Sequence, residues 1–174
     1  QDYLKDWVRK LTKDCADVSV LNLKSMLFTD CIARESHVFD VEIAAYLDNP
    51  LKSSYTYEDI AREYLNLVFP SRSELLGKMT EKDAVRERED QLMRMACFMS
   101  YTAFAARQPL WNRLEEKEMK HLYKYVELPL VYVLYDMEKE GIQVQKEELA
   151  LYGEKLQVRI QELEEIIYRQ AGEK

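Results

Sequence analysis

Two short apolar runs, each followed at once by a helical pattern, constrain the fold of this chain most strongly. Residues 18–21 read as a β-strand that leads into a helix over residues 26–33, and Val38–Asp40 reads as a second strand ahead of another helix. This order implies two parallel strands in an α/β layer. Asn22 and Lys24 follow the first strand, at the end where open α/β sheets tend to bind ligands.

Helical periodicity dominates the remaining sequence. Only four Gly and four Pro occur in 174 residues, so there are few places to break a helix. Leu4, Trp7 and Leu11 predict a helix over residues 2–13 with one buried face. Residues 70–90 are largely polar and contain helix breakers, so we expect a mobile connection there.

The second half of the chain is expected to be almost wholly helical. A helix capped by Thr80 should run to about Arg107, Pro129 suits the first turn of a helix ending at Gly141, and a long helix should start at Lys146. A run of methionine and aromatic residues in the first of these helices could line an apolar binding cleft, but we favour core packing. Its large side chains are Met93, Met95, Phe98, Met99, Tyr101 and Phe104.

Charge and cysteine content exclude several classes of protein. A net charge of -7 argues against a surface devoted wholly to nucleic-acid phosphates. The three cysteines show no metal-binding spacing, which disfavours both zinc and disulfides and suits a reducing cytoplasm. No apolar run approaches the length of a membrane span, so we expect a cytoplasmic segment of a longer protein, with no membrane partner.

Several segments of the chain together resemble the bacterial family A DNA polymerases. The first segment has three parts: a strand that ends in phenylalanine-aspartate, a helix with an alanine-tyrosine-leucine sequence, and the helix after it. Together they are similar to part of the 3'-5' exonuclease domain. The others are similar to the entry into the polymerase domain and to the base of its thumb. The matching residues are 38–48 with 55–65, then 127–134 with 137–144, and finally 164–173.

The resemblance implies an α/β, helix-rich fold: part of a ribonuclease H-like exonuclease fold with a small parallel sheet, followed by long thumb helices. Residues 1–112 would form the exonuclease-like domain, lacking its earliest strands, and residues 113–174 the start of the polymerase domain. In that family, clustered carboxylates hold two divalent metals that activate water. Hard cations such as magnesium require oxygen ligands.

The resemblance also implies that this metal site is lost. In the family's second exonuclease motif, an Asn-x-Lys pair is followed two residues later by a metal-binding aspartate; Asn22 and Lys24 keep the pair, but Met26 stands at the aspartate. Met95 and Tyr101 align with the tyrosine and aspartate of the third motif, and the first motif has no counterpart. We therefore expect no catalytic residue, no metal ligand and no cofactor here, although the parent polymerase would use magnesium.

Alternatives remain open at this stage. In one alternative, Asp30, Asp40 and Glu42 rebuild a displaced metal site for an active exonuclease; in another, the chain is an unrelated helical interaction module. Asn22 and Lys24 could contact DNA phosphate, but we favour a bond from Asn22 to the loop backbone and a solvated Lys24.

The expected partners follow from the resemblance and from the last helix. They are DNA, through the parent polymerase in replication and repair, and the remainder of that polymerase. The C-terminal helix should also self-associate through an apolar stripe. That stripe contains Leu149, Leu156, Ile160 and Leu163.

Overall fold

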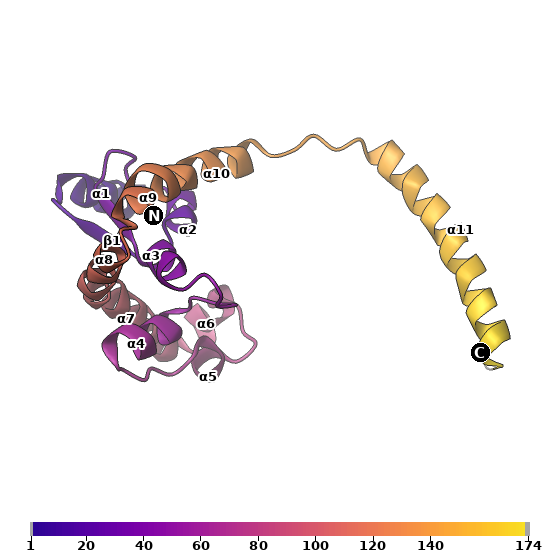
Figure 1. Cartoon of the computed structure of the whole chain (residues 1–174), viewed down its shortest axis with the longest axis horizontal. Coiled ribbons are helices and arrows are strands. Elements are labelled where there is room, and N and C mark those ends of the chain that lie inside the picture. Colours follow the sequence, from indigo (N-terminus) through magenta and orange to yellow (C-terminus); the bar gives the residue numbers. More distant parts are fainter. Residues whose placement is uncertain (1, 173–174) are drawn as a thin grey trace. The chain divides into compact units, whose positions relative to one another are not determined.

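The structure is a computed structural model that describes residues 2–172. The chain forms two compact units, residues 1–138 and residues 139–174. The first unit contains strands β1 (Val18–Val20) and β2 (Val38–Asp40), surrounded by helices (Figure 1). These helices are α1 (Asp2–Asp14), α2 (Leu23–Phe28), α3 (Val41–Asp48), α4 (Tyr57–Leu65), α5 (Arg72–Leu76), α6 (Glu81–Glu87), α7 (Glu89–Ala105), α8 (Arg107–Glu116), α9 (Lys120–Leu122), the π-helical turn η1 (Tyr123–Glu127) and nearly all of α10 (Leu128–Glu140).

The two strands pair in parallel, as the sequence predicts. Val18 lies opposite Val38 and Val20 lies opposite Asp40. Both strands therefore end at the same edge of the sheet, because parallel strands run in one direction. Among the described residues the sheet has these two strands, so the fold is helix-rich α/β with a small parallel sheet.

Helix α2 differs from its expected range, since it begins three residues earlier and ends five residues sooner. Its start is set by Asn22, whose side-chain oxygen accepts a hydrogen bond from the Ser25 N–H at 2.8 Å. Soon after its end, Asp30 adopts a left-handed conformation with φ of 59°. Such a residue does not continue a right-handed helix, so residues 30–37 form a loop.

Residues 70–90 are not the long connection that their polarity predicts, because most of them form α5 and α6. Ser71 and Glu74 cap α5 reciprocally, and Thr80 caps α6 by accepting from the Asp83 N–H at 3.2 Å. The single helix expected from Thr80 to Arg107 is interrupted at Arg88, where φ is -143° and ψ is 46°. Local capping thus decides the structure of this segment.

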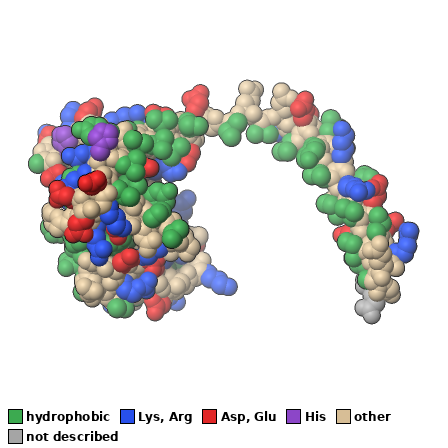
Figure 2. Space-filling model, in the orientation of Figure 1, with side chains coloured by type: hydrophobic (Ala, Val, Ile, Leu, Met, Phe, Trp, Pro, Cys, Tyr) green, Lys and Arg blue, Asp and Glu red, His purple; other side chains and the backbone are tan. Residues whose placement is uncertain are grey.

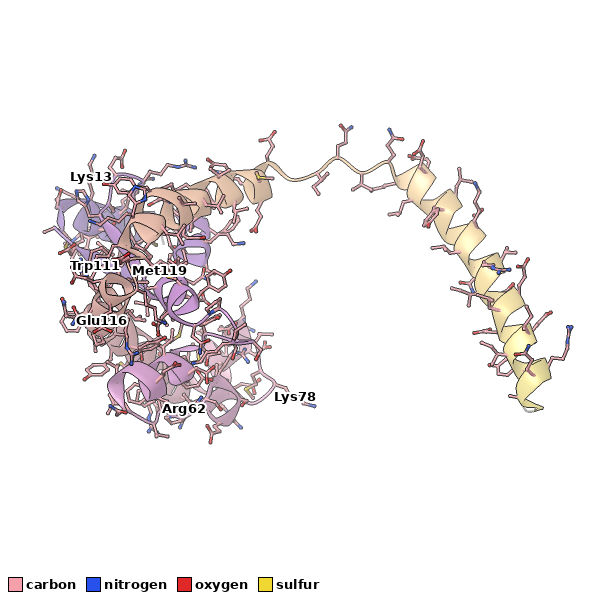
Figure 3. All side chains as sticks on the ribbon, viewed as in Figure 1. Lys13, Arg62, Lys78, Trp111, Glu116 and Met119 are labelled. Carbon is pink, nitrogen blue, oxygen red and sulfur yellow. The ribbon has the colours of Figure 1, made fainter. Side chains whose placement is uncertain are left out.

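Among the described residues, three clusters of buried side chains hold the first unit together. The first joins β2 to α3, α4, α8 and η1, with Trp111 and Met119 at its margin (Figure 3). The second joins both strands to α2 and to Val131 of α10. The third joins α4 to α5, α6 and α7 through Leu76 and Met95. Helix α10 therefore packs against this unit along one side, through Val131 with Leu128, Tyr132 and Tyr135.

Two apolar faces predicted to be buried are exposed instead. On α1, Leu4 is 63% exposed and Trp7 is 53% exposed. On α7, Met95 is buried as expected, but Tyr101 is 51% exposed and Phe104 is 77% exposed. Periodicity identifies the apolar face of a helix correctly, but it does not show whether the described part of the chain covers that face.

The second unit consists mainly of α11 (Lys146–Ala171), which begins where the sequence predicts. Its apolar side chains are exposed, as Figure 2 shows along the helix. Leu149 is 62% exposed and Ile160 is 47% exposed. Within residues 2–172, no helix is both long and apolar enough to cross a membrane.

Candidate functional site

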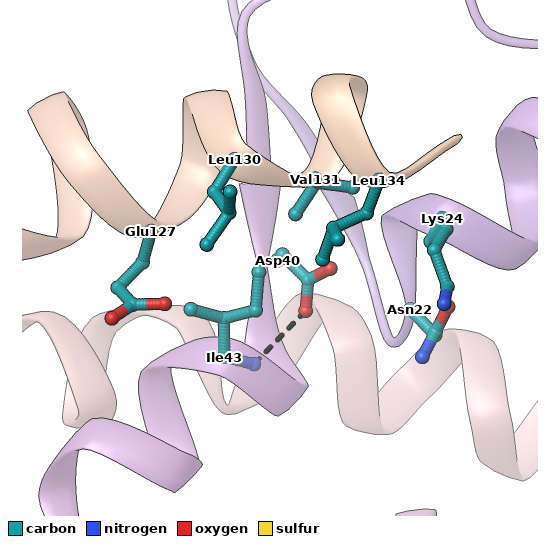
Figure 4. Close-up of a pocket in the computed structure, with 8 residues that line it drawn as sticks. All are labelled: Asn22, Lys24, Asp40, Ile43, Glu127, Leu130, Val131 and Leu134. Atoms are coloured by element: carbon teal, nitrogen blue, oxygen red, sulfur yellow. Dashed lines mark hydrogen bonds between the residues drawn. The ribbon is translucent and has the colours of Figure 1, made fainter. Parts of the chain in front are cut away.

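The carboxyl ends of the two strands form one wall of a small pocket. Asp40 is the last residue of β2, and Asn22 follows β1 after one residue. Figure 4 shows α10 passing over these residues. The pocket has a volume of about 190 Å³ and is lined by Asn22, Lys24, Asp40, Ile43, Glu127, Leu130, Val131 and Leu134.

Asp40 is the most constrained side chain in this pocket. It is 2% exposed, and its carboxylate accepts hydrogen bonds from the Leu23 N–H at 2.7 Å and the Ile43 N–H at 3.1 Å. These bonds tie the start of α2 to the start of α3. Burial raises the pKa of Asp40 to about 7, although both hydrogen bonds act in the opposite direction. Asp40 is therefore a structural carboxyl group that connects two helix starts to the sheet.

Tyr123 completes this network from a distant part of the sequence. Its hydroxyl accepts a hydrogen bond from the Asp40 N–H at 2.7 Å and donates one to the Asp40 carbonyl at 3.2 Å. Burial raises the pKa of the Tyr123 hydroxyl well above its ordinary value. The sequence did not predict this role for Tyr123. The chain has twelve tyrosines, and no feature of the neighbouring sequence distinguishes Tyr123 from the other eleven.

Asn22 and Lys24 both have protein partners. Asn22 binds backbone in the first turn of α2 rather than in a loop, because its side-chain oxygen accepts from the Ser25 N–H, and its side-chain nitrogen donates to Glu42. Lys24 is not simply solvated, because its ammonium group lies 2.5 Å from a carboxylate oxygen of Glu138 on α10. A phosphate at this position would have to compete with that carboxylate.

The three positions expected to replace the metal site do not share one location. Met26 is partly buried against the cluster formed by the strands, α2 and α10. Met95 is 6% exposed within the cluster formed by α4 to α7. Tyr101 is mostly exposed and meets the edge of Phe69, with the ring centroids 6.2 Å apart. Tyr101 is therefore not buried together with the two methionines.

The nearby carboxylates do not offer a second arrangement for a metal. Asp30 is exposed and pairs with Arg9 at 3.3 Å, while Asp40 and Glu42 bind the backbone and Asn22. No group of three or more histidine, cysteine, aspartate or glutamate residues in the described range is arranged to hold a metal ion. The thioether of Met26 is also a poor ligand for a hard cation. The residues at the strand ends therefore do not fit a divalent metal.

These features define a helix-rich α/β domain. The polar side chains that line the pocket at its strand ends are bound to other groups of the protein. No family model matches the chain. The chain is 30% identical to DNA polymerase I of Bacillus subtilis over 135 residues, which are 78% of this chain and 15% of that protein. It is 29% identical to DNA polymerase I of Streptococcus pneumoniae over 170 residues, 97% of this chain and 19% of that protein.

A third relative matches a shorter stretch at higher identity. DNA polymerase I of Chloroflexus aurantiacus is 47% identical over 64 residues, which are 36% of this chain and 7% of that protein. The chain is thus homologous to one segment of DNA polymerase I. It spans less than a fifth of the length of these relatives.

Proposed function

We propose that the chain is a non-catalytic, exonuclease-like scaffold that supports a DNA polymerase in replication and repair. Residues 1–112 would form the remnant of a ribonuclease H-like exonuclease domain, and residues 113–174 the first helices of the polymerase thumb. Magnesium would serve the polymerase site elsewhere in the parent protein, and the chain would act in the cytoplasm. Homology to DNA polymerase I supports the broad assignment.

One observation supports the loss of exonuclease activity above all others. The polar groups at the strand ends are engaged with the protein itself, because Asp40 accepts two backbone N–H groups and Lys24 faces Glu138. A metal-dependent nuclease needs several free carboxylates converging on one point. The side chains that line this pocket instead connect the sheet to α2, α3 and α10, and holding elements together in this way is the role of a scaffold.

An exonuclease assay tests the proposal. The chain is incubated with 5'-labelled single-stranded DNA and either magnesium or manganese, with an active 3'-5' exonuclease as the positive control. We expect no shortening of the DNA above the level without protein. Metal-dependent shortening that disappears in Asp40→Asn or Glu42→Gln would overturn the proposal, and would support an active exonuclease with displaced carboxylates.

DNA binding at Asn22 and Lys24 is a separate part of the proposal. A phosphate bound there would have to displace Glu138, so we expect at most weak binding by this chain alone. Fluorescence anisotropy with labelled single-stranded DNA measures this, with Lys24→Met as the variant and the exposed Lys78→Met as its control. Tight binding lost only in Lys24→Met would show a functional site at the strand ends.

The exposed stripe of α11 supports a further proposal, that the chain self-associates. Leu149, Leu156, Ile160 and Leu163 are all at least 42% exposed, and they repeat at helical spacing. Pairing of two such helices would remove these side chains from water. Sedimentation velocity should show dimers that Leu156→Glu abolishes; a strict monomer at high concentration would count against the proposal.

A further inference from the structure

Two lysine side chains from α9 and η1 lie over the ring of a single tryptophan on α8. The ammonium groups of Lys120 and Lys124 are 4.4 Å and 5.1 Å from the centroid of the Trp111 ring. The indole is fixed in place, because it meets Phe39 and Tyr123 edge to face, with ring centroids 6.1 Å and 6.3 Å apart. Its electron-rich face attracts both cations, and it therefore holds two positive charges close to each other.

Nearby carboxylates offset these two charges only weakly. Among the described residues, Lys124 has no ion-pair partner. Lys120 pairs with Glu115 at 2.6 Å, but the Glu115 side chain is 68% exposed, so water screens this pair. Residues 107–125 contain five Lys or Arg and three Glu, whereas the whole chain has a net charge of -7. This segment is therefore basic within an acidic chain, and it should attract anions.

Two aromatic side chains accompany the lysines along the same turns. His121 and Tyr125 are in contact, with ring centroids 4.7 Å apart, and Tyr125 is 68% exposed. Each ring directly follows one of the two lysines in the sequence, so positive charges and aromatic rings alternate along α9 and η1. The segment Tyr123–Glu127 is a π-helical turn, and such rare turns are often found at functional sites.

We propose that Lys120, Lys124 and Tyr125 form a binding site for single-stranded DNA. Two neighbouring ammonium groups suit a phosphate backbone, and an exposed aromatic ring stacks on an unpaired base. An acidic peptide would use the lysines but would leave the ring of Tyr125 without a stacking partner. The site consists of other residues than Asn22 and Lys24. The choice of DNA over RNA rests on the proposed support of a DNA polymerase, whereas the site itself does not depend on the absence of catalysis.

Fluorescence anisotropy tests this site with a labelled deoxythymidine strand of about 12 nucleotides, which is long enough to cover one binding surface. Low salt and EDTA in place of metal separate the result from the exonuclease assay, because a failure to bind leaves the absence of catalysis unaffected. We expect saturable binding with a dissociation constant of about 1–100 μM. A duplex of the same length should bind more weakly, since its bases are already stacked.

Chain variants separate stacking from charge. Tyr125→Ala should weaken binding about fivefold or more without changing its salt dependence, whereas Tyr125→Phe keeps the ring and should bind like the wild type. Lys124→Met should weaken binding and reduce the slope of log affinity against log salt concentration by about 0.7. Both positions are exposed, so the melting temperature should change little. Lys78→Met, which changes an exposed lysine on another loop, is the matched control and should leave binding unchanged.

Several results would overturn the proposal. One is the absence of saturable binding at low salt, and another is unchanged binding by Tyr125→Ala. Equally tight binding of an oligo-glutamate peptide would also count against it, because the surface would then attract any polyanion. Binding that is lost in Lys24→Met and kept in Lys124→Met would move the site to the strand ends. Tighter binding of an RNA strand of the same length would reject DNA as the ligand.

Discussion

Replacing Asp40 with asparagine should flatten the pH dependence of folding stability between pH 5 and pH 8. In the folded chain Asp40 has a pKa of about 7, raised by burial from an ordinary value of 3.8. The folded state therefore binds more protons than the unfolded state between these two values. Stability from this group is fully present below pH 3.8 and is lost as the pH rises through 7.

The magnitude follows from the size of the shift. A change of about three pKa units corresponds to about 4 kcal/mol in total, of which roughly 2.5 kcal/mol falls between pH 5 and pH 8. Asparagine does not ionise, so Asp40→Asn lacks this term. The variant should be less stable than the wild type at pH 5, by about 1–3 kcal/mol, because the amide accepts with only one oxygen. This deficit should shrink or reverse by pH 8.

Urea unfolding followed by circular dichroism measures the effect at half-unit steps of pH. Asp48 and Asp59 have lowered pKa values, so the stability that they contribute is lost at acidic pH, below this window. Asp14→Asn, which changes an exposed carboxylate on α1, is the matched control and should follow the wild type. Parallel curves for Asp40→Asn and the wild type from pH 5 to pH 8 would refute the reasoning, because Asp40 would then be ionised throughout.

Three further substitutions probe the same unit. Tyr123→Phe removes the hydroxyl that bonds both backbone groups of Asp40 and should cost about 1–3 kcal/mol in urea unfolding. Leu110→Ala empties a fully buried position and should cost about 2–5 kcal/mol by the same assay. Lys24→Met breaks a partly exposed pair with Glu138 and should cost at most about 1 kcal/mol, with a difference that fades in high salt. A larger, salt-independent loss for Lys24→Met would show that the pair is a main support of α10.

Local sequence signals predicted much of the secondary structure because their physical causes are local. Thr80 caps a helix as expected, and α10 and α11 start close to Pro129 and at Lys146. The parallel strand pair was also predicted correctly. The segment 70–90 was misjudged because its polarity outweighed the capping box at its start. Capping depends on a few hydrogen bonds, which average polarity does not measure.

The candidate site was only partly predictable. The sequence predicted that Asn22, Lys24 and Asp40 lie at the same edge of the sheet, because parallel strands end on the same side, and all three line the pocket there. It did not predict that Glu138 pairs with Lys24 or that Tyr123 bonds to Asp40, because these partners lie 114 and 83 residues away. Such pairs form only when α10 and η1 pack against the sheet. No pattern within one helix or strand encodes them.

The sequence alone predicted both strands, most of the helices and the apolar face of α1, because backbone hydrogen bonding and side-chain periodicity act over a few residues. The resemblance to the polymerase family also predicts that Met26 stands at the position of a metal-binding aspartate, and this stays a prediction. Only the tertiary structure decided that Asp40 is buried and engaged with two backbone amides, and that Phe104 is exposed. Burial depends on what packs against a side chain, and here that is set by contacts between elements far apart in the chain.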